Sequence, residues 1–300
     1  MSNPSDMEVS RQFELKMYID STSAMYENAL LQNGEIYDTA SRFTREFADI
    51  SAQAILADSR IIKILRYLVT PSISQMKFGQ LFEFQSIGKF EDARVLPDSN
   101  KYRELERIAP KIADFVGERL DRRRFLWLSS KDHDFPISRE YAKNWTCSLV
   151  ADQNAQTNYR NWRKDQQEHA VTSHLIQLGY TKTKFNGVIN RATDLRIGEF
   201  SREIKVRGRT IQKADMAFRS RRSKKLILIE AKAVGVELDA TKRIKECSDK
   251  AGDWRASAEL EEPTVVAVIA GFFSQGNLEN LSSSGVSIVW EHHLEGLDAF

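Results

Sequence analysis

Cysteine is scarce in this chain of 300 residues, which contains only Cys147 and Cys247. The two lie far apart and in no metal-binding spacing, so neither a disulfide framework nor a structural zinc site is expected. Long apolar runs are also missing, since none approaches the roughly 20 residues that span a bilayer. The first residues lack the basic start and the apolar middle of a signal peptide. We therefore expect a cytoplasmic protein without a membrane segment.

Proline and glycine are few, with 6 and 14 residues in the whole chain. The 41% hydrophobic and 29% charged residues are typical of a globular protein and argue against extended disorder. The length favours one large domain or two modest ones. The net charge of +2 hides a local cluster, because residues 201–225 contain ten Lys or Arg and two acidic residues. Such clustering, more than the total charge, is typical of nucleic-acid binding.

The first half of the chain has the periodicity of helices, and the second half that of alternating strands and helices. We place the boundary near residue 155, with a mostly helical region at 1–155 and an α/β region at 156–300. Pro110 is expected between helices or at a helix end. Apolar positions recur every three or four residues in four stretches of the first half, at 11–31, 36–56, 61–69 and 102–128.

Two helices are predicted in the second half. The first, over 159–178, places Glu168 on the same inward face as Val171 and Leu175. The second follows Asp239, a good capping residue, and carries an apolar stripe at four and three residue spacing. That stripe consists of Ala240, Ile244, Cys247, Ala251 and Trp254.

Several strands accompany these helices. Continuous apolar runs at 264–273 and 286–290 are typical of buried parallel strands. Three further strands are predicted at 202–206, 211–218 and 225–233, the last two joined into a hairpin by the polar, basic turn 219–223. The second half is therefore predicted to be an α/β fold, with a mixed sheet flanked by helices.

The hairpin carries the residues best suited to chemistry. Side chains alternate along a strand, so Glu230 and Lys232 project from one face while Ala231 points away. If the register puts Asp215 of the partner strand on that face, two carboxylates and one amine converge. Two close carboxylates favour a hard divalent cation such as Mg²⁺, bound by Asp215, Glu230 and the Ala231 carbonyl. Lys232 would then orient or help deprotonate an attacking water.

Other interpretations of these residues stay open. Glu203 and Lys205, with Asp194 upstream, form a rival pattern that lacks the strongly apolar strand before Glu230. The site residues could also be a solvated strand end with an ion pair. The pair His292-His293 and the run Asp132-His133-Asp134 are expected to be structural or exposed, with no bound zinc.

The motif Lys213-Ala214-Asp215, the hairpin and Glu230-Ala231-Lys232 resemble those of PD-(D/E)XK nucleases, with Ala214 in place of the motif's proline. Several segments are more narrowly similar to the XamI family of type II restriction endonucleases. They are RNWRKDQQEHAVTSHLIQLGY, KADMAF, LILIEAKAVG and VVAVIAGFF with VSIVWEHHLEGL. The resemblance covers about 159–300, and the helical first half only loosely. It implies a restriction-endonuclease-like core, Mg²⁺-dependent cleavage of double-stranded DNA at a short sequence, and a site role for Glu168, with Gln167 as the alternative.

DNA contacts would come from exposed basic side chains. Those predicted are Arg209, Arg219, Arg221, Arg222, Lys242 and Arg243. The helical first half would clamp and recognise the DNA, and two chains would act together as a homodimer on a palindromic target. A repair or junction-resolving nuclease of the same fold, and an inactive DNA-binding protein, are the alternatives.

Overall fold

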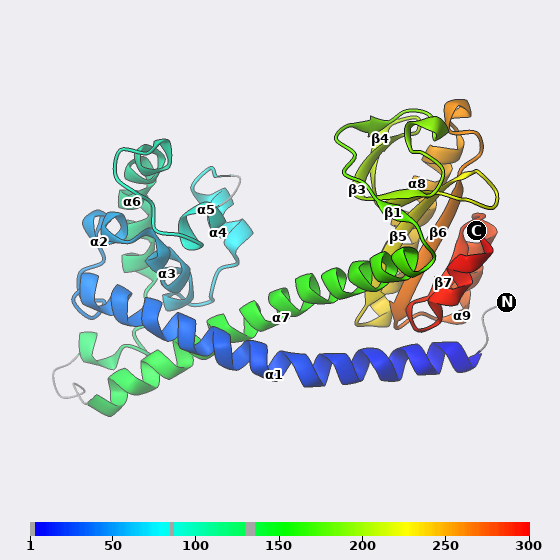
Figure 1. Cartoon of the computed structure of the whole chain (residues 1–300). Coiled ribbons are helices and arrows are strands. Elements are labelled where there is room, and N and C mark those ends of the chain that lie inside the picture. The colour runs from blue at the N-terminus through cyan, green and yellow to red at the C-terminus, as the bar shows by residue number, and fades with distance from the viewer. Residues whose placement is uncertain (1–3, 85–86, 130–135) are drawn as a thin grey trace. The chain divides into compact units, whose positions relative to one another are not determined.

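The computed structural model describes residues 4–84, 87–129 and 136–300 (Figure 1). Asp132, His133 and Asp134 therefore lie outside the described residues. The chain divides into two compact units, one of residues 1–21 with 159–300 and one of residues 22–158. Among the described residues, no helix is both long enough and apolar enough to cross a membrane.

The unit of residues 22–158 is helical. Two long helices, α1 (Pro4–Phe43) and α7 (Pro136–Gln177), contribute one part to each unit. The buried core of this helical unit includes Ile55, Ile64, Phe78 and Ile108. The shorter elements are α2 (Ala52–Ala57), η1 (Ser59–Ile61), α3 (Ile62–Leu68), α4 (Gln75–Leu81), α5 (Gly88–Glu91), α6 (Asn100–Arg119) and η2 (Leu126–Leu128).

Helix boundaries are where the sequence-based expectations are wrong. Helix α1 continues from Pro4 to Phe43 through the predicted gap at 32–35, because the buried residues Ala29, Tyr37 and Ala40 on either side of the gap pack in one helix and outweigh weak local propensity. Pro110 lies inside α6, where a buried stripe that includes Ile108 and Ile112 offsets a cost of about 3 kcal/mol. Helix α6 ends at Arg119, nine residues before the predicted end.

The second unit is a mixed α/β structure, as the sequence predicts. Its seven-stranded sheet has the order β1-β3-β4-β5-β6-β7, with β2 also paired to β3. Strands β3, β4 and β5 are antiparallel, whereas β5, β6 and β7 are parallel. The strands are β1 (Thr181–Lys182), β2 (Val188–Ile189), β3 (Glu199–Arg207), β4 (Ile211–Arg219), β5 (Leu226–Val234), β6 (Thr264–Gly271) and β7 (Ser287–Trp290).

Helices cover both faces of this sheet. On one face, Val171 and Leu175 of α7 pack with Met216, Ile229 and Val268. On the other face lie α8 (Glu237–Arg255) and α9 (Gln275–Ser283), whose apolar side chains pack against Leu228 and Ala267, among others. Short 3-10 helices complete the unit: η4 (Ala192–Asp194), η5 (Ala258–Leu260) and η6 (Glu291–Ala299).

Helix α8 buries the whole predicted stripe from Ala240 to Trp254. It begins at Glu237, so Asp239 lies in its first turn and Val236 occupies the cap position. The prediction that Asp239 caps the helix is therefore wrong. An acidic residue in the first turn still interacts favourably with the helix dipole.

The hairpin of β4 and β5 opens partway along its length. Its pairs run from Arg219 opposite Leu226 to Met216 opposite Ile229. Beyond them β4 stays paired with β3 and β5 with β6. Asp215 and Glu230 are the next residues in this register, so they lie where the two strands separate.

Candidate functional site

Asp215, Glu230 and Lys232 converge where β4 and β5 separate. The Lys232 ammonium Nζ lies 2.6 Å from Glu230 Oε2 and 3.3 Å from Asp215 Oδ2. The register thus brings together the three side chains that the hairpin pattern singles out.

This cluster is held below the protein surface. Glu230 has no exposed area, and Asp215 is 8% exposed. The backbone N–H of Ala231 donates to Asp215 Oδ2 at 2.9 Å, which fixes that carboxylate against β5. Buried carboxylates are costly unless cations and hydrogen bonds compensate them, so the surrounding positive groups are a requirement of the fold.

Lys250 of α8 is a second cation on Glu230 that the sequence-based analysis missed. Its Nζ lies 2.8 Å from Oε1 and 2.9 Å from Oε2, and it also donates to the Lys213 carbonyl at 2.7 Å. A signal was present, because Lys250 stands three residues after Cys247 and four before Trp254, at the edge of the apolar stripe.

Electrostatics within the cluster raise the pKa of Lys232. Burial alone would lower it, but the negative charges of Glu230 and Asp215 outweigh that effect. The thiol of Cys247 lies beside the same groups, and burial followed by the charge of Glu230 raises its pKa to about 12.

Glu168 lies on α7 and is 1% exposed. Arg202 of β3 donates to its Oε2 at 2.5 Å, and Lys164 Nζ lies 3.3 Å from Oε1. Burial lowers the pKa of Lys164, but Glu168 and then Asp215 raise it above its ordinary value, so Lys164 interacts with both carboxylates. Among the described residues, Glu168 does not form a group with Asp215 and Glu230 whose ligand atoms lie within 4.8 Å of one another.

Gln167, the alternative to Glu168, is fully buried. Its Nε2 donates to the Val268 carbonyl at 3.2 Å, and its Oε1 has no hydrogen-bond partner. Val268 pairs with Ala231 in the sheet. Gln167 is therefore anchored on β6 beside the strand that carries Glu230.

The rival pattern of Glu203, Lys205 and Asp194 does not assemble in this structure. Glu203 is exposed and pairs with Lys213 at 2.8 Å. Asp194 accepts the backbone N–H groups of Asn190 and Arg191 at 2.8 and 3.0 Å. These contacts give Asp194 a capping role.

The basic residues predicted to touch DNA lie in three places. Arg219, Arg221 and Arg222 are at the closed tip of the β4–β5 hairpin, where Arg221 donates to the Gly179 carbonyl at 2.5 Å. Lys242 and Arg243 are exposed on α8, and Arg243 pairs with Glu246 at 3.2 Å. Arg209 is exposed in the β3–β4 turn, on the side where β4 and β5 have separated.

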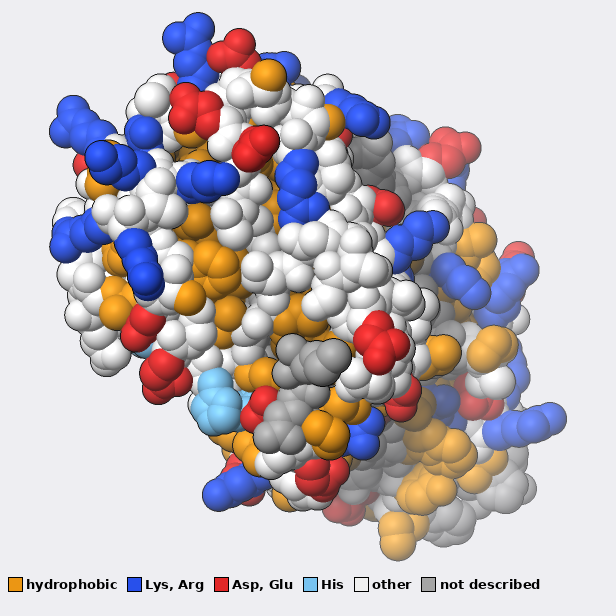
Figure 2. Space-filling model, turned by 90° about the vertical axis from the view of Figure 1, so that its right-hand side faces the viewer, with side chains coloured by type: hydrophobic (Ala, Val, Ile, Leu, Met, Phe, Trp, Pro, Cys, Tyr) orange, Lys and Arg blue, Asp and Glu red, His pale blue; other side chains and the backbone are white. Residues whose placement is uncertain are grey.

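Charge is mixed on the one face of the molecule that Figure 2 shows. On the face shown in Figure 2, Lys and Arg side chains are interspersed with Asp, Glu and hydrophobic side chains. The position of each basic residue relative to the carboxylates, more than charge alone, therefore indicates which of them contact DNA.

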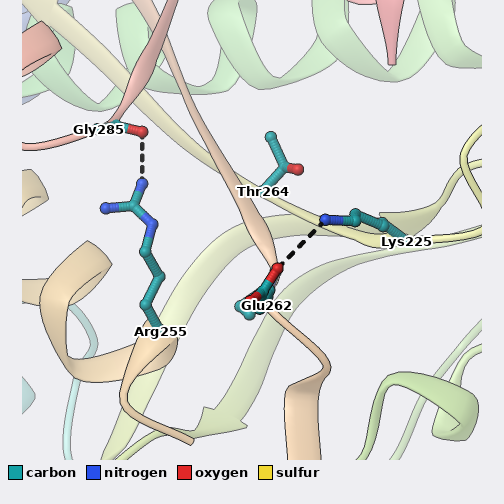
Figure 3. Close-up of a pocket in the computed structure, with 6 residues that line it drawn as sticks. Lys225, Arg255, Glu262, Thr264 and Gly285 are labelled. Carbon is teal, nitrogen blue, oxygen red and sulfur yellow. Dashed lines mark hydrogen bonds and ion pairs between the residues drawn. The ribbon is translucent and has the colours of Figure 1, made fainter. Parts of the chain in front are cut away.

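A pocket of about 430 Å³ lies elsewhere, next to Thr264 at the start of β6 (Figure 3). Lys225 and Glu262 form an ion pair of 3.7 Å at its rim, and Arg255 donates to the Gly285 carbonyl at 2.5 Å. The lysine and the arginine that line this pocket are thus already paired within the chain, and we assign the pocket no catalytic or binding role.

Comparison with known proteins identifies the family. The type II restriction enzyme SalI of Streptomyces albus G is 24% identical over 302 aligned residues, which span 98% of this chain and 95% of that enzyme. A sequence profile described as XamI restriction endonuclease matches residues 45–290. This match confirms the resemblance seen in the motifs and extends it into the helical first half. The chain belongs to the XamI restriction endonuclease family.

Proposed function

We propose that this restriction endonuclease is a type II enzyme that hydrolyses double-stranded DNA at a short sequence, with Mg²⁺ bound at Asp215 and Glu230. The observation that supports this most directly is the Lys232 ammonium, which lies within 3.3 Å of both carboxylates at the point where β4 and β5 separate. The family supports nuclease activity on DNA. The antiparallel β3–β5, the parallel β5–β7 and the flanking α7 and α8 support a PD-(D/E)XK core.

The donor set fits a magnesium ion. One ammonium already reaches Asp215 and Glu230 together, so the two carboxylates are close enough to share a cation. Their ligand atoms are all oxygens, which hard cations prefer, and the carbonyl of Ala231 would add another. When bound, Mg²⁺ would polarise the scissile phosphate and lower the pKa of a coordinated water.

The side chains of the site would orient the reacting groups and compensate charge. Lys232 donates hydrogen bonds, so it would orient the attacking water and offset the negative charge that grows on the phosphate oxygens. The water oxygen attacks phosphorus and loses a proton, one phosphorus–oxygen ester bond breaks, and the leaving oxygen takes up a proton to become a hydroxyl. Lys250 would position Glu230 through its two contacts with that carboxylate. Glu168, buried on α7 and paired with Lys164 and Arg202, would extend the charged site.

We propose that DNA approaches where β4 and β5 diverge. Arg209 lies on this open side and would contact the phosphate backbone. Arg219, Arg221 and Arg222 occupy the closed tip, and Lys242 and Arg243 lie on α8, so a role in DNA binding stays a prediction for these five.

Residues 1–155 are proposed to clamp and recognise the DNA, and the enzyme to act as a homodimer. Two sites related by two-fold symmetry match a palindromic target and cut both strands. Light scattering of the purified enzyme should give twice the mass of one chain, whereas the mass of a single chain would contradict the dimer.

A panel of DNA substrates tests the proposed reaction. The enzyme is incubated with plasmid, a four-way junction and mismatched duplex, each with Mg²⁺ or with EDTA. We expect plasmid to give discrete fragments in Mg²⁺ only. Preferential cutting of the junction or mismatch would instead indicate a repair nuclease of the same fold, and DNA binding without any cutting would indicate an inactive binder.

A further inference from the structure

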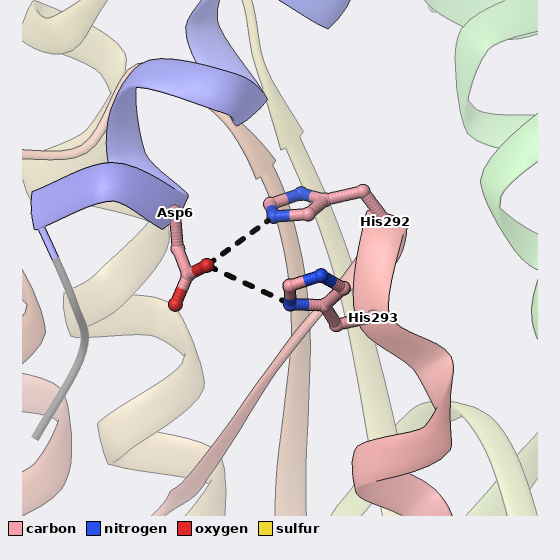
Figure 4. Close-up of side chains that lie close together, drawn as sticks. All are labelled: Asp6, His292 and His293. Atoms are coloured by element: carbon pink, nitrogen blue, oxygen red, sulfur yellow. Dashed lines mark ion pairs between the residues drawn. The ribbon is translucent and has the colours of Figure 1, made fainter.

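A second cluster of possible metal ligands lies at the first turn of α1, apart from the nuclease carboxylates. Asp6, His292 and His293 each offer one ligand atom, and these atoms all lie within 4.8 Å of one another. Figure 4 shows both imidazole rings turned toward the Asp6 carboxylate, from the segment that follows β7. Among the described residues, this is the group of three that meets that spacing.

The distances suit a shared ion better than direct hydrogen bonds. Asp6 Oδ1 lies 3.8 Å from His292 Nε2 and 3.6 Å from His293 Nδ1. Both separations exceed the range of a hydrogen bond. Ligands at 2.0–2.1 Å in a tetrahedral zinc site lie about 3.4 Å from one another, close to the separations of Asp6 Oδ1 from the two imidazole nitrogens.

An unsatisfied atom points to the same place. Nε2 of His292 is buried and has no hydrogen-bond partner, although buried polar nitrogens are nearly always paired. The side chain of His292 is 14% exposed and that of His293 is 64% exposed. A metal ion would therefore meet a buried ligand on one side and solvent on the other.

The position of Asp6 is held by contacts further along α1. Ser10 Oγ accepts the Gly271 N–H at 2.7 Å, at the end of β6. Glu14 pairs with Arg163 at 2.7 Å, and Arg163 in turn binds Glu291 through two contacts of 3.0 and 2.8 Å. The start of α1 is thus fastened to the segment that carries both histidines.

We propose that Asp6, His292 and His293 bind a zinc ion, with water as the fourth ligand. Two imidazole nitrogens and one carboxylate are ligand types that Zn²⁺ accepts, whereas Mg²⁺ prefers oxygen ligands alone. The ion would link the first turn of α1 to the segment that follows β7. The sequence predicts no zinc here, because Asp6 and the histidines stand 286 or more residues apart and only the fold joins them.

Zinc titration by calorimetry tests this site separately from the nuclease site. The background is an Asp215→Asn, Glu230→Gln chain without a histidine tag, stripped with EDTA. The amides keep the shape and hydrogen bonding of the two carboxylates, so the fold is retained while the nuclease site loses its negative charge and binds no zinc. We expect one Zn²⁺ per chain in this background. His292→Ala and His293→Ala should each weaken zinc binding by at least about tenfold. Zn²⁺ should raise the melting temperature of the background but not that of the two histidine variants.

His174→Ala is the matched control, because His174 pairs with Asp298 outside the cluster. It should bind zinc as the background does. His293 is the more exposed ligand, so His293→Ala keeps the test valid if His292→Ala fails to fold. Unchanged zinc binding by His293→Ala, or no zinc bound by the background, would overturn the proposal, and neither result bears on Mg²⁺-dependent cleavage.

Discussion

Glu230 is a fully buried carboxylate that two lysines neutralise from different elements. Lys232 comes from the same strand, and Lys250 reaches across from α8. Together the two ammonium groups balance Glu230 and Asp215 before any metal binds. A buried carboxylate that loses such a partner must find another cation or lose stability.

Replacing Lys250 by methionine should expose this balance. Without metal, the Lys250→Met protein should be less stable by about 1.5–3 kcal/mol, since a charged hydrogen-bond partner of Glu230 is removed. Mg²⁺ should then raise its melting temperature more than that of the wild type, because the ion replaces the lost charge. Thermal unfolding with and without Mg²⁺ measures both effects.

Lys242→Met serves as the control on the same helix, because Lys242 is exposed and lies 4.0 Å from Glu246. Its melting temperature should match the wild type with and without Mg²⁺. If Mg²⁺ shifts Lys250→Met and Lys242→Met equally, the ion does not bind at Glu230.

At the scale of elements, the end of β6 depends on a glycine. Gly271 has φ +94°, and a Cβ there would lie 2.0 Å from the Val234 carbonyl oxygen. Gly271→Ala should therefore destabilise the protein by about 1–3 kcal/mol from backbone strain, with the clash in addition. Urea unfolding measures it against Gly276→Ala in α9, where a Cβ meets nothing within 4 Å. Equal midpoints for the two variants would show that β6 tolerates a side chain there.

The β3–β4 turn is the element predicted to touch the DNA backbone. Arg209→Ala, in a Glu230→Gln background that should not cut, should weaken DNA binding and reduce the slope of log K against log salt by about 0.9. Fluorescence anisotropy at several salt concentrations gives the slope. Arg191→Ala is the matched control, because Arg191 is similarly exposed but pairs with Glu259 at 3.5 Å. An unchanged slope for Arg209→Ala would remove this turn from the DNA interface.

Strands β3 to β7 were predictable to within three residues because their signals are local, whereas β1 and β2, each two residues long, were missed. The apolar run before Glu230 and the alternation around it placed β5 and the site on one face. The helices were harder, since α1 and α7 are far longer than the periodic stretches, and packing decided where they continued. Lys250 and Arg202 escaped prediction because their partners, Glu230 and Glu168, lie on other elements.

At the scale of the whole molecule, the two compact units share the long helices α1 and α7. The α/β unit carries Asp215, Glu230 and Lys232, and the family profile spans both units. We propose that the two units have different roles. The carboxylates of the α/β unit would cut the DNA, while the helical residues would help hold and recognise it.

Asp215 and Glu230 are proposed to form the site at which DNA is cut. The most direct test compares the Mg²⁺-dependent plasmid cleavage rates of the wild type, Asp215→Asn and Glu230→Gln, with DNA binding measured in parallel. Each variant should bind DNA but cut it at least about a hundredfold more slowly, as expected when a group that acts on the transition state is removed. Cleavage by either variant at the wild-type rate would show that the replaced carboxylate is not needed for the reaction.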